Sequence, residues 1–95
     1  MFVACAIHHP HPDHVEDFLG HMRLVIETVR GAPGLLAFDA LRDEGSGDLI
    51  GLSRWRTRED FEAALPLIAA NVDRRQPEWT IGEDELLLLS PVDHR

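Results

Sequence analysis

Hydrophobic residues recur with helical spacing between residues 12 and 30. Steps of three and four separate the apolar positions, which are Val15, Phe18, Leu19, Met22, Val25, Ile26 and Val29. At about 100° per residue, this spacing places them on one stripe of a helix. Pro12 suits the first helical position, and Gly31 with Pro33 forms a stop signal. The pattern predicts an amphipathic helix over residues 12–30.

A second helical pattern occupies residues 57–75. Thr57 is a good N-cap, with Asp60 at the third helical position. The apolar positions that we expect to be buried are Phe61, Ala64, Leu65 and Ile68. Pro66 lies in the middle, where its ring removes a backbone donor and clashes with the preceding turn. We therefore expect either a kink or two consecutive short helices.

Four short apolar segments are typical of strands rather than helices. They are "FVACAI" at 2–7, "LLAFDALR" at 35–42, "LIGLSRW" at 49–55 and "ELLLLSPV" at 85–92. The segment "DEGSGD" at 43–48 is rich in turn-forming residue types, which predicts a hairpin between the second and third strands.

The order strand, helix, strand, strand, helix, strand is a split βαβ pair of the ferredoxin-like type. We predict an α+β fold in one domain over residues 1–95, with a four-stranded antiparallel sheet covered by two helices on one face. The first strand and the leucine run are apolar at every position, whereas a solvated antiparallel sheet alternates. A second copy of the chain is the expected cover, which gives a homodimer through the sheet face and a dimeric α/β barrel.

Charge and cysteine content narrow the partners and the compartment. Nine Lys and Arg against seventeen Asp and Glu give a net charge of −8, which repels nucleic acid and anionic membranes. No apolar run approaches the roughly 20 residues that span a bilayer. The single cysteine, Cys5, has no intramolecular partner, so we expect a core residue and a reducing, cytoplasmic location.

The chain resembles the antibiotic biosynthesis monooxygenase family. The resemblance rests on "APG" after the first helix, "FDALRD" in the second strand, and "RWRTREDFEAA" from the third strand into the second helix. Trp55 takes the position of the family's Trp at the end of that strand, and Phe61 follows six residues later. The resemblance implies dimeric α/β barrels whose activities include cofactor-free oxygenation of phenols or quinols, and haem degradation in one branch.

The residues of the haem-degrading branch are not present at the matching positions. That branch has an Asn on the first strand, where this chain has Ile7 or its neighbours, and a His on the second helix, where it has Ala64 or Leu65. Ser53 stands where an acidic residue is often found. We therefore do not expect haem degradation, and we expect no cofactor.

Trp55 is the first candidate for a substrate site. Alternate strand residues point the same way, so Trp55 shares a face with Gly51 and Ser53, two small residues. An indole beside them could wall a cavity for a planar aromatic ligand, with Phe18 and Phe61 contributed by the helices. The alternative is that the small residues only make room for the helix side chains in a packed core.

Histidines of the first helix are candidate bases for deprotonating a phenol. His21 borders the apolar stripe and is the first candidate, with His14 second. Asp17 is four residues before His21, so contact between them is expected to orient the ring and raise its pKa. The alternative is that both histidines are boundary residues facing solvent.

The segment "IHHPHPDH" at 7–14 contains four of the six histidines. Adjacent strand residues point to opposite faces, so only one of His8 and His9 can face the pocket, and His8 is the substrate-binding candidate. We do not expect a native metal site, because His14 and His21 are seven residues apart and the prolines alone explain the end of the strand. Trp79 could cap the pocket from the same or the neighbouring subunit.

These patterns lead to two functional hypotheses. The first is a cofactor-independent monooxygenase of a small aromatic, phenolic or quinol substrate, with His21, His14 and Trp55 as catalytic candidates. The second is a non-catalytic dimeric module that binds a small apolar ligand.

Overall fold

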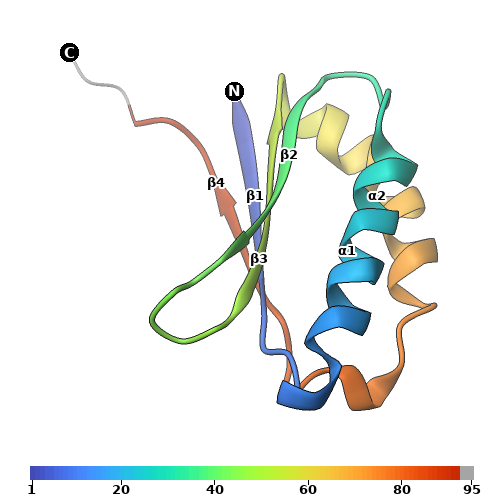
Figure 1. The fold of residues 1–95 in the computed structure, drawn as a ribbon. Helices are drawn as coiled ribbons and strands as arrows, with labels where there is room; N and C mark the ends of the chain where they lie inside the picture. Colours follow the sequence, from blue (N-terminus) through green and yellow to red (C-terminus); the bar gives the residue numbers. More distant parts are fainter. Residues whose placement is uncertain (93–95) are drawn as a thin grey trace.

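One antiparallel sheet forms one layer of the molecule, and two helices form the other (Figure 1). The computed structural model describes residues 1–92. The strand order is β2-β3-β1-β4, and the strands are β1 (Phe2–His8), β2 (Leu35–Arg42), β3 (Leu49–Trp55) and β4 (Glu85–Leu89). This is the ferredoxin-like topology predicted from the order of the elements, and the α+β fold class is confirmed.

The helices lie close to their predicted bounds. A short 3₁₀ turn, η1 (Pro12–His14), leads into α1 (Val15–Val29). The second helix, α2 (Arg58–Val72), starts after Thr57, whose hydroxyl accepts a hydrogen bond of 3.1 Å from the backbone N–H of Asp60. A second 3₁₀ turn, η2 (Pro77–Trp79), precedes β4. No helix in residues 1–92 has the length and hydrophobicity needed to cross a membrane.

The second helix differs from the prediction at its centre. A single helix runs through Pro66, so the alternative of two short helices is wrong. Because Pro66 has no backbone N–H, the carbonyl of Glu62 lacks its helical hydrogen bond. Both residues are exposed, so water can hydrate that carbonyl. Leu65 is 40% exposed, contrary to the expectation of burial, because the core-facing stripe passes through Phe61 and Ala64.

Strand register decides which residues face the helices. Ala6 of β1 is paired with Gly51 of β3 and with Leu86 of β4. Paired residues on neighbouring strands point to the same side of a sheet. The even-numbered residues of β1 and the odd-numbered residues of β3 therefore face α1 and α2.

The opposite face of the sheet carries no helix in the described part of the chain (Figure 1). Its side chains are mostly apolar and partly or largely exposed, and they include Val3, Cys5, Ile7, Leu41, Ile50, Leu52, Leu87 and Leu89. Cys5 thus belongs to this outer face rather than to the core under the helices.

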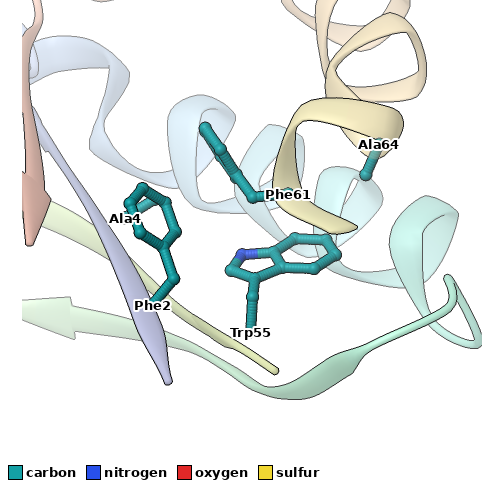
Figure 2. Packing of buried hydrophobic residues seen from close by; sticks show 5 residues of the cluster. All are labelled: Phe2, Ala4, Trp55, Phe61 and Ala64. Carbon is teal, nitrogen blue, oxygen red and sulfur yellow. The ribbon is translucent and has the colours of Figure 1, made fainter. Parts of the chain in front are cut away.

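Under the helices, one end of the sheet is tightly filled. Figure 2 shows the buried cluster there, in which the Trp55 indole lies between β3 and α2. We call this cluster the packed end; it consists of Phe2, Ala4, Trp55, Phe61 and Ala64. Further along the sheet, a second cluster joins Phe18 and Met22 of α1 to Leu49 of β3.

Candidate functional site

A cavity of about 280 Å³ lies between the sheet and the helices at the other end of β1 and β3. We call this region the hollow end. Gly51 lines this cavity without a side chain, and a Cβ there would lie 3.5 Å from Phe38 and 3.9 Å from Met22, at ordinary contact distance. The lining is mostly apolar and consists of Ala6, His8, Phe18, His21, Met22, Val25, Phe38, Gly51, Ile68, Val72, Arg75, Asp84, Glu85 and Leu86.

The mouth of the cavity lies between α2 and β4. Three of the lining residues are also exposed to solvent: Leu86 at 56%, Val72 at 37%, and Glu85. Leu86 is on the edge strand β4, and Val72 is the last residue of α2. A ligand can therefore enter beside the edge strand.

The ionisable part of the lining is centred on Asp84. Its Oδ1 lies 3.0 Å from Nδ1 of His8, and its Oδ2 lies 2.6 Å from Nη2 of Arg75. Nδ1 of His8 and Oδ1 of Asp84 are both buried, and within residues 1–92 neither atom has a hydrogen-bond partner. Their contact is therefore an ion-pair contact, without the geometry of a good hydrogen bond. Burial raises the pKa of Asp84, but the contacts with His8 and Arg75 outweigh it and leave the pKa below its ordinary value. Asp84 is therefore ionised at neutral pH.

His21 lines the same cavity from α1. Only 8% of its surface is exposed, and its ring packs between Phe18, at 5.8 Å between centroids, and Trp79, at 6.0 Å. Burial lowers the pKa of His21, and the nearby guanidinium of Arg75 lowers it further, while the carboxylate of Asp84 acts in the opposite direction. His21 is therefore neutral at pH 7.

The expected contact between Asp17 and His21 is absent. Asp17 instead lies 2.9 Å from Nδ1 of His14, three residues before it on the same exposed side of α1. The expectation that Asp17 raises the pKa of His21 is therefore wrong, because His21 faces inward, where burial decides its pKa. His14 does not line the cavity.

The residues predicted around Trp55 form no cavity. Trp55 is fully buried, its Nε1–H donates a hydrogen bond of 2.9 Å to Oγ of Ser53, and Phe61 packs against it at 5.8 Å (Figure 2). The structure therefore separates the predicted site residues. His8, Phe18, His21 and Gly51 lie together at the cavity, whereas Ser53, Trp55 and Phe61 belong to the filled region at the other end.

The histidine-rich segment is divided between the two faces of the sheet. His8 faces the cavity, and its ring lies 4.9 Å from that of Phe18. His9 faces away, with its two ring nitrogens 2.8 Å from Asp48 and 2.9 Å from Glu85. Within residues 1–92, no three His, Cys, Asp or Glu side chains are grouped to hold a metal ion.

Arg75 and Asp84 are the cavity residues that sequence reasoning missed. Arg75 follows α2, where a cation suits the negative end of the helix dipole, and Asp84 lies in a polar turn, so neither residue stands out in the sequence. One signal was available, since the antiparallel pairing of the first and last strands of this topology brings the start of β4 to the end of β1. Trp79 packs against His21 of its own chain.

The arrangement combines an apolar chamber with a small ionisable wall. The chamber can exclude water from a planar ligand, and two imidazoles can exchange a proton with it. The charged side chains in the lining are the carboxylates of Asp84 and Glu85 and the guanidinium of Arg75. Arg75 is paired with Asp84, and Glu85 contacts His9 on the other side of the sheet.

Comparison with known proteins identifies the fold and the family. The family model described as antibiotic biosynthesis monooxygenase matches residues 1–66. No curated protein matches the sequence significantly. Solved structures share the fold at low identity, so they support the fold alone.

Three of these structures cover nearly the whole chain. Rv0793 from Mycobacterium tuberculosis is 19% identical with a TM-score of 0.83, over 98% of this chain and 96% of that one. PA3566 from Pseudomonas aeruginosa is 17% identical with a TM-score of 0.80, over 97% and 94%. The haem degrader MhuD from M. tuberculosis is 22% identical with a TM-score of 0.77, over 100% and 99%.

Proposed function

Because the chain belongs to the antibiotic biosynthesis monooxygenase family, we propose that it oxygenates a small phenol or hydroquinone without a cofactor. The observation that carries this proposal is the apolar cavity with His8 and His21 in its lining. Both imidazoles line the cavity, where a hydroxyl group of a bound ligand would be close to them.

The chemistry requires a substrate that supplies its own electrons. A phenol with a free ring position and O₂ give a quinone and water: one oxygen atom enters the ring, and the other leaves as water with two hydrogens of the substrate. No external reductant is needed. The protein must remove the phenol proton, because the phenolate donates an electron to O₂ more readily, and it must keep water away from the reactive intermediates.

The size of the cavity limits the substrate. A cavity of about 150 Å³ is large enough for benzene. The 280 Å³ at the hollow end therefore suits a molecule of one or two fused rings. Hydroquinones and naphthols fit this range best, and a tricyclic anthrone marks its upper limit.

Oxygen uptake tests the proposal directly. Hydroquinone, 1-naphthol and anthrone are incubated with the wild type, with Gly51→Leu and with Gly20→Ala. Gly51→Leu places a side chain in the cavity, whereas Gly20 is exposed on α1 with open space around it. We expect uptake above the buffer rate for the wild type and Gly20→Ala, and its loss in Gly51→Leu. Uptake that never exceeds the buffer rate contradicts the proposal.

The mostly apolar lining also favours a second function, that of a non-catalytic module for an apolar ligand. Trp79 packs on His21 at the cavity wall, so ligand binding should change its fluorescence. Saturable fluorescence changes with naphthalene and 1-naphthol alike, without oxygen uptake, support the binding module over the enzyme.

We also propose that the outer face of the sheet pairs with a second copy of the chain. Its apolar side chains, among them the half-buried Ile50 and Leu52 and the exposed Leu87, form a surface of the kind that soluble monomers rarely leave uncovered. Light scattering should give twice the 10.7 kDa mass of one chain. Leu52→Glu should reduce the mass to that of the monomer, and a monomeric wild type at micromolar concentration contradicts this pairing.

A further inference from the structure

We infer that His8 is the general base for this reaction and that Asp84, held by Arg75, positions its ring, so that the ligand is bound as a phenolate. This inference rests on the proposed function and goes beyond it. It replaces His21 and His14 with a residue of β1 as the catalytic residue, and it specifies the ionisation state of the ligand.

Strand register places His8 and Asp84 together. Ile7 of β1 is paired with Glu85 of β4 in an antiparallel ladder, so the next pair outward joins His8 to Asp84. The 3.0 Å between Nδ1 and Oδ1 follows from this register. Asp84 directly precedes β4, so the end of the strand ladder holds its side chain opposite His8.

Arg75 completes the arrangement from the turn that follows α2. Its guanidinium lies 2.6 Å from the second oxygen of Asp84 and 5.7 Å from the centre of the Phe18 ring. With one oxygen engaged by Arg75, Asp84 presents the other to His8. A carboxylate at Nδ1 favours the tautomer with the proton on that nitrogen, which leaves Nε2 as the proton acceptor. Within residues 1–92, Nε2 of His8 has no hydrogen-bond partner of its own.

The proton transfer is balanced without any other reagent. The O–H bond of the phenol breaks, an N–H bond forms at Nε2 of His8, and the electron pair stays on the phenolate oxygen. The imidazolium then lies between the carboxylate of Asp84 and the phenolate. The total charge is unchanged, and both new charges have a partner of opposite sign, which matters in an apolar cavity.

His21 is less suited to the same task. Within residues 1–92, no carboxylate contacts its ring, because Asp17 is paired with His14 on the outside of α1. The charged and titratable groups around the His8 site are Asp84, Arg75, His21 and Glu85, and Glu85 is in contact with His9 at 2.9 Å. Only Asp84 of this set lies within ion-pair distance of His8.

A coloured phenol separates ionisation from oxygen chemistry. We use 4-nitrophenol, whose phenolate is yellow and which does not react with O₂, at a pH below its own pKa. Binding is measured independently by calorimetry. We expect the wild type and the control Gly20→Ala, which changes only the exposed side of α1, to bind the probe and turn it yellow. We expect His8→Gln to bind it within a few fold of the wild type and to leave it colourless.

The role of Asp84 has its own readout. Asp84→Asn should shift the pH at which the bound probe ionises upward by about one unit, a tenfold change in ionisation. Asp84→Glu should recover part of that shift, because the carboxylate is kept. A purely structural role for Asp84 predicts weaker binding of the probe with no change in its ionisation pH, and that result overturns the positioning role.

A wild-type measurement makes the inference independent of variant folding. Nitrogen-15 NMR of the histidine rings should show His8 with its proton on Nδ1 in the free protein and doubly protonated in the complex. The Nε2–H tautomer, a neutral His8 in the complex, or a yellow complex with His8→Gln each overturns the inference. Failure of the wild type to bind any phenol contradicts the proposed function itself.

Discussion

The packed end and the hollow end lie on the same face of one sheet, under the same two helices. Side chains fill the space at the packed end, whereas the hollow end encloses a cavity. The difference can be followed along β3. Trp55 fills the space at the packed end, and Gly51, four residues earlier on the same face, leaves it open. Along this strand face, the largest side chain thus lies where the layers are filled, and the residue without a side chain lies in the cavity wall.

The two ends also differ in their polar groups. At the packed end, the buried indole N–H is satisfied by the Ser53 hydroxyl, a neutral hydrogen bond within one strand. At the hollow end, His8, Asp84 and Arg75 come from three separate parts of the chain. The first arrangement stabilises the fold, whereas the second costs desolvation energy that a purely structural core would avoid.

Removing the indole should have the largest effect on stability. Trp55→Ala leaves a void among fully packed neighbours and should lower the free energy of unfolding by about 3–5 kcal/mol. Urea denaturation followed by circular dichroism measures this loss. The milder Trp55→Phe should keep 4-nitrophenol binding, because Trp55 does not line the cavity. A folded Trp55→Phe that no longer binds the probe contradicts the division into two ends.

Filling the hollow end should affect binding more than stability. Gly51→Leu puts three extra carbons beyond a Cβ that itself fits at ordinary contact distance, and the backbone φ there is not positive. We expect probe affinity to fall at least about tenfold, or about 1.4 kcal/mol, while the free energy of unfolding changes by less. Calorimetry and urea denaturation measure the two quantities. Unchanged affinity places the ligand elsewhere.

Acidity should destabilise the hollow end through His21. The folded-state pKa of His21 is below the 6.5 of an unfolded chain, so the unfolded state binds more protons as the pH falls. The stabilisation is fully present above pH 6.5 and is lost as the pH falls from 6.5 toward the folded-state value. His21→Gln should remove this part of the pH dependence of urea denaturation, and an unchanged profile contradicts the assignment.

His9, on the outer side of the sheet, should change the pH dependence of stability in the direction opposite to that of His21. Contacts with Asp48 and Glu85 raise its pKa in the folded state. Its stabilisation is therefore fully present below pH 6.5 and is lost as the pH rises through the folded-state value. In His9→Gln, the stability should fall less between pH 6 and pH 8 than in the wild type.

The fold could be predicted because its signals are local. The stripe from Val15 to Val29 and the turn at residues 43–48 each depend on neighbouring residues, and they fixed the order of the elements. The strand alternation also placed Gly51, Ser53 and Trp55 on one face. The continuity of α2 through Pro66 could not be read locally, because it depends on which side of the helix faces water.

The site could be predicted only in part, because it depends on packing between distant segments. Phe61 is placed against Trp55 by the docking of α2, and periodicity cannot say whether it fills that space or lines it. Asp84 contacts both His8 and Arg75, and His8 is separated from the other two residues by most of the length of the chain. The composition of a single strand face showed that a cavity was feasible but not at which end it lies.

The smallest effect should come from a position that belongs to neither end. Gly20 is exposed in the middle of α1, and an added Cβ meets nothing within 4 Å. Gly20→Ala should raise the free energy of unfolding by about 0.5–1 kcal/mol, because alanine has the higher helix propensity. Urea denaturation measures this gain, and 4-nitrophenol affinity should not change. A change in affinity indicates that the ligand contacts the outside of α1.

The most direct test of the two-end division is where a bound phenol lies. Nuclear Overhauser contacts between 4-nitrophenol and the protein locate it without any variant. We predict contacts from the probe's ring protons to the Met22 methyl group and the Gly51 Hα protons, which line the cavity, and none to the Trp55 indole. Contacts to Trp55 or Phe61, without any to Met22 and Gly51, contradict the assignment of the hollow end as the functional site.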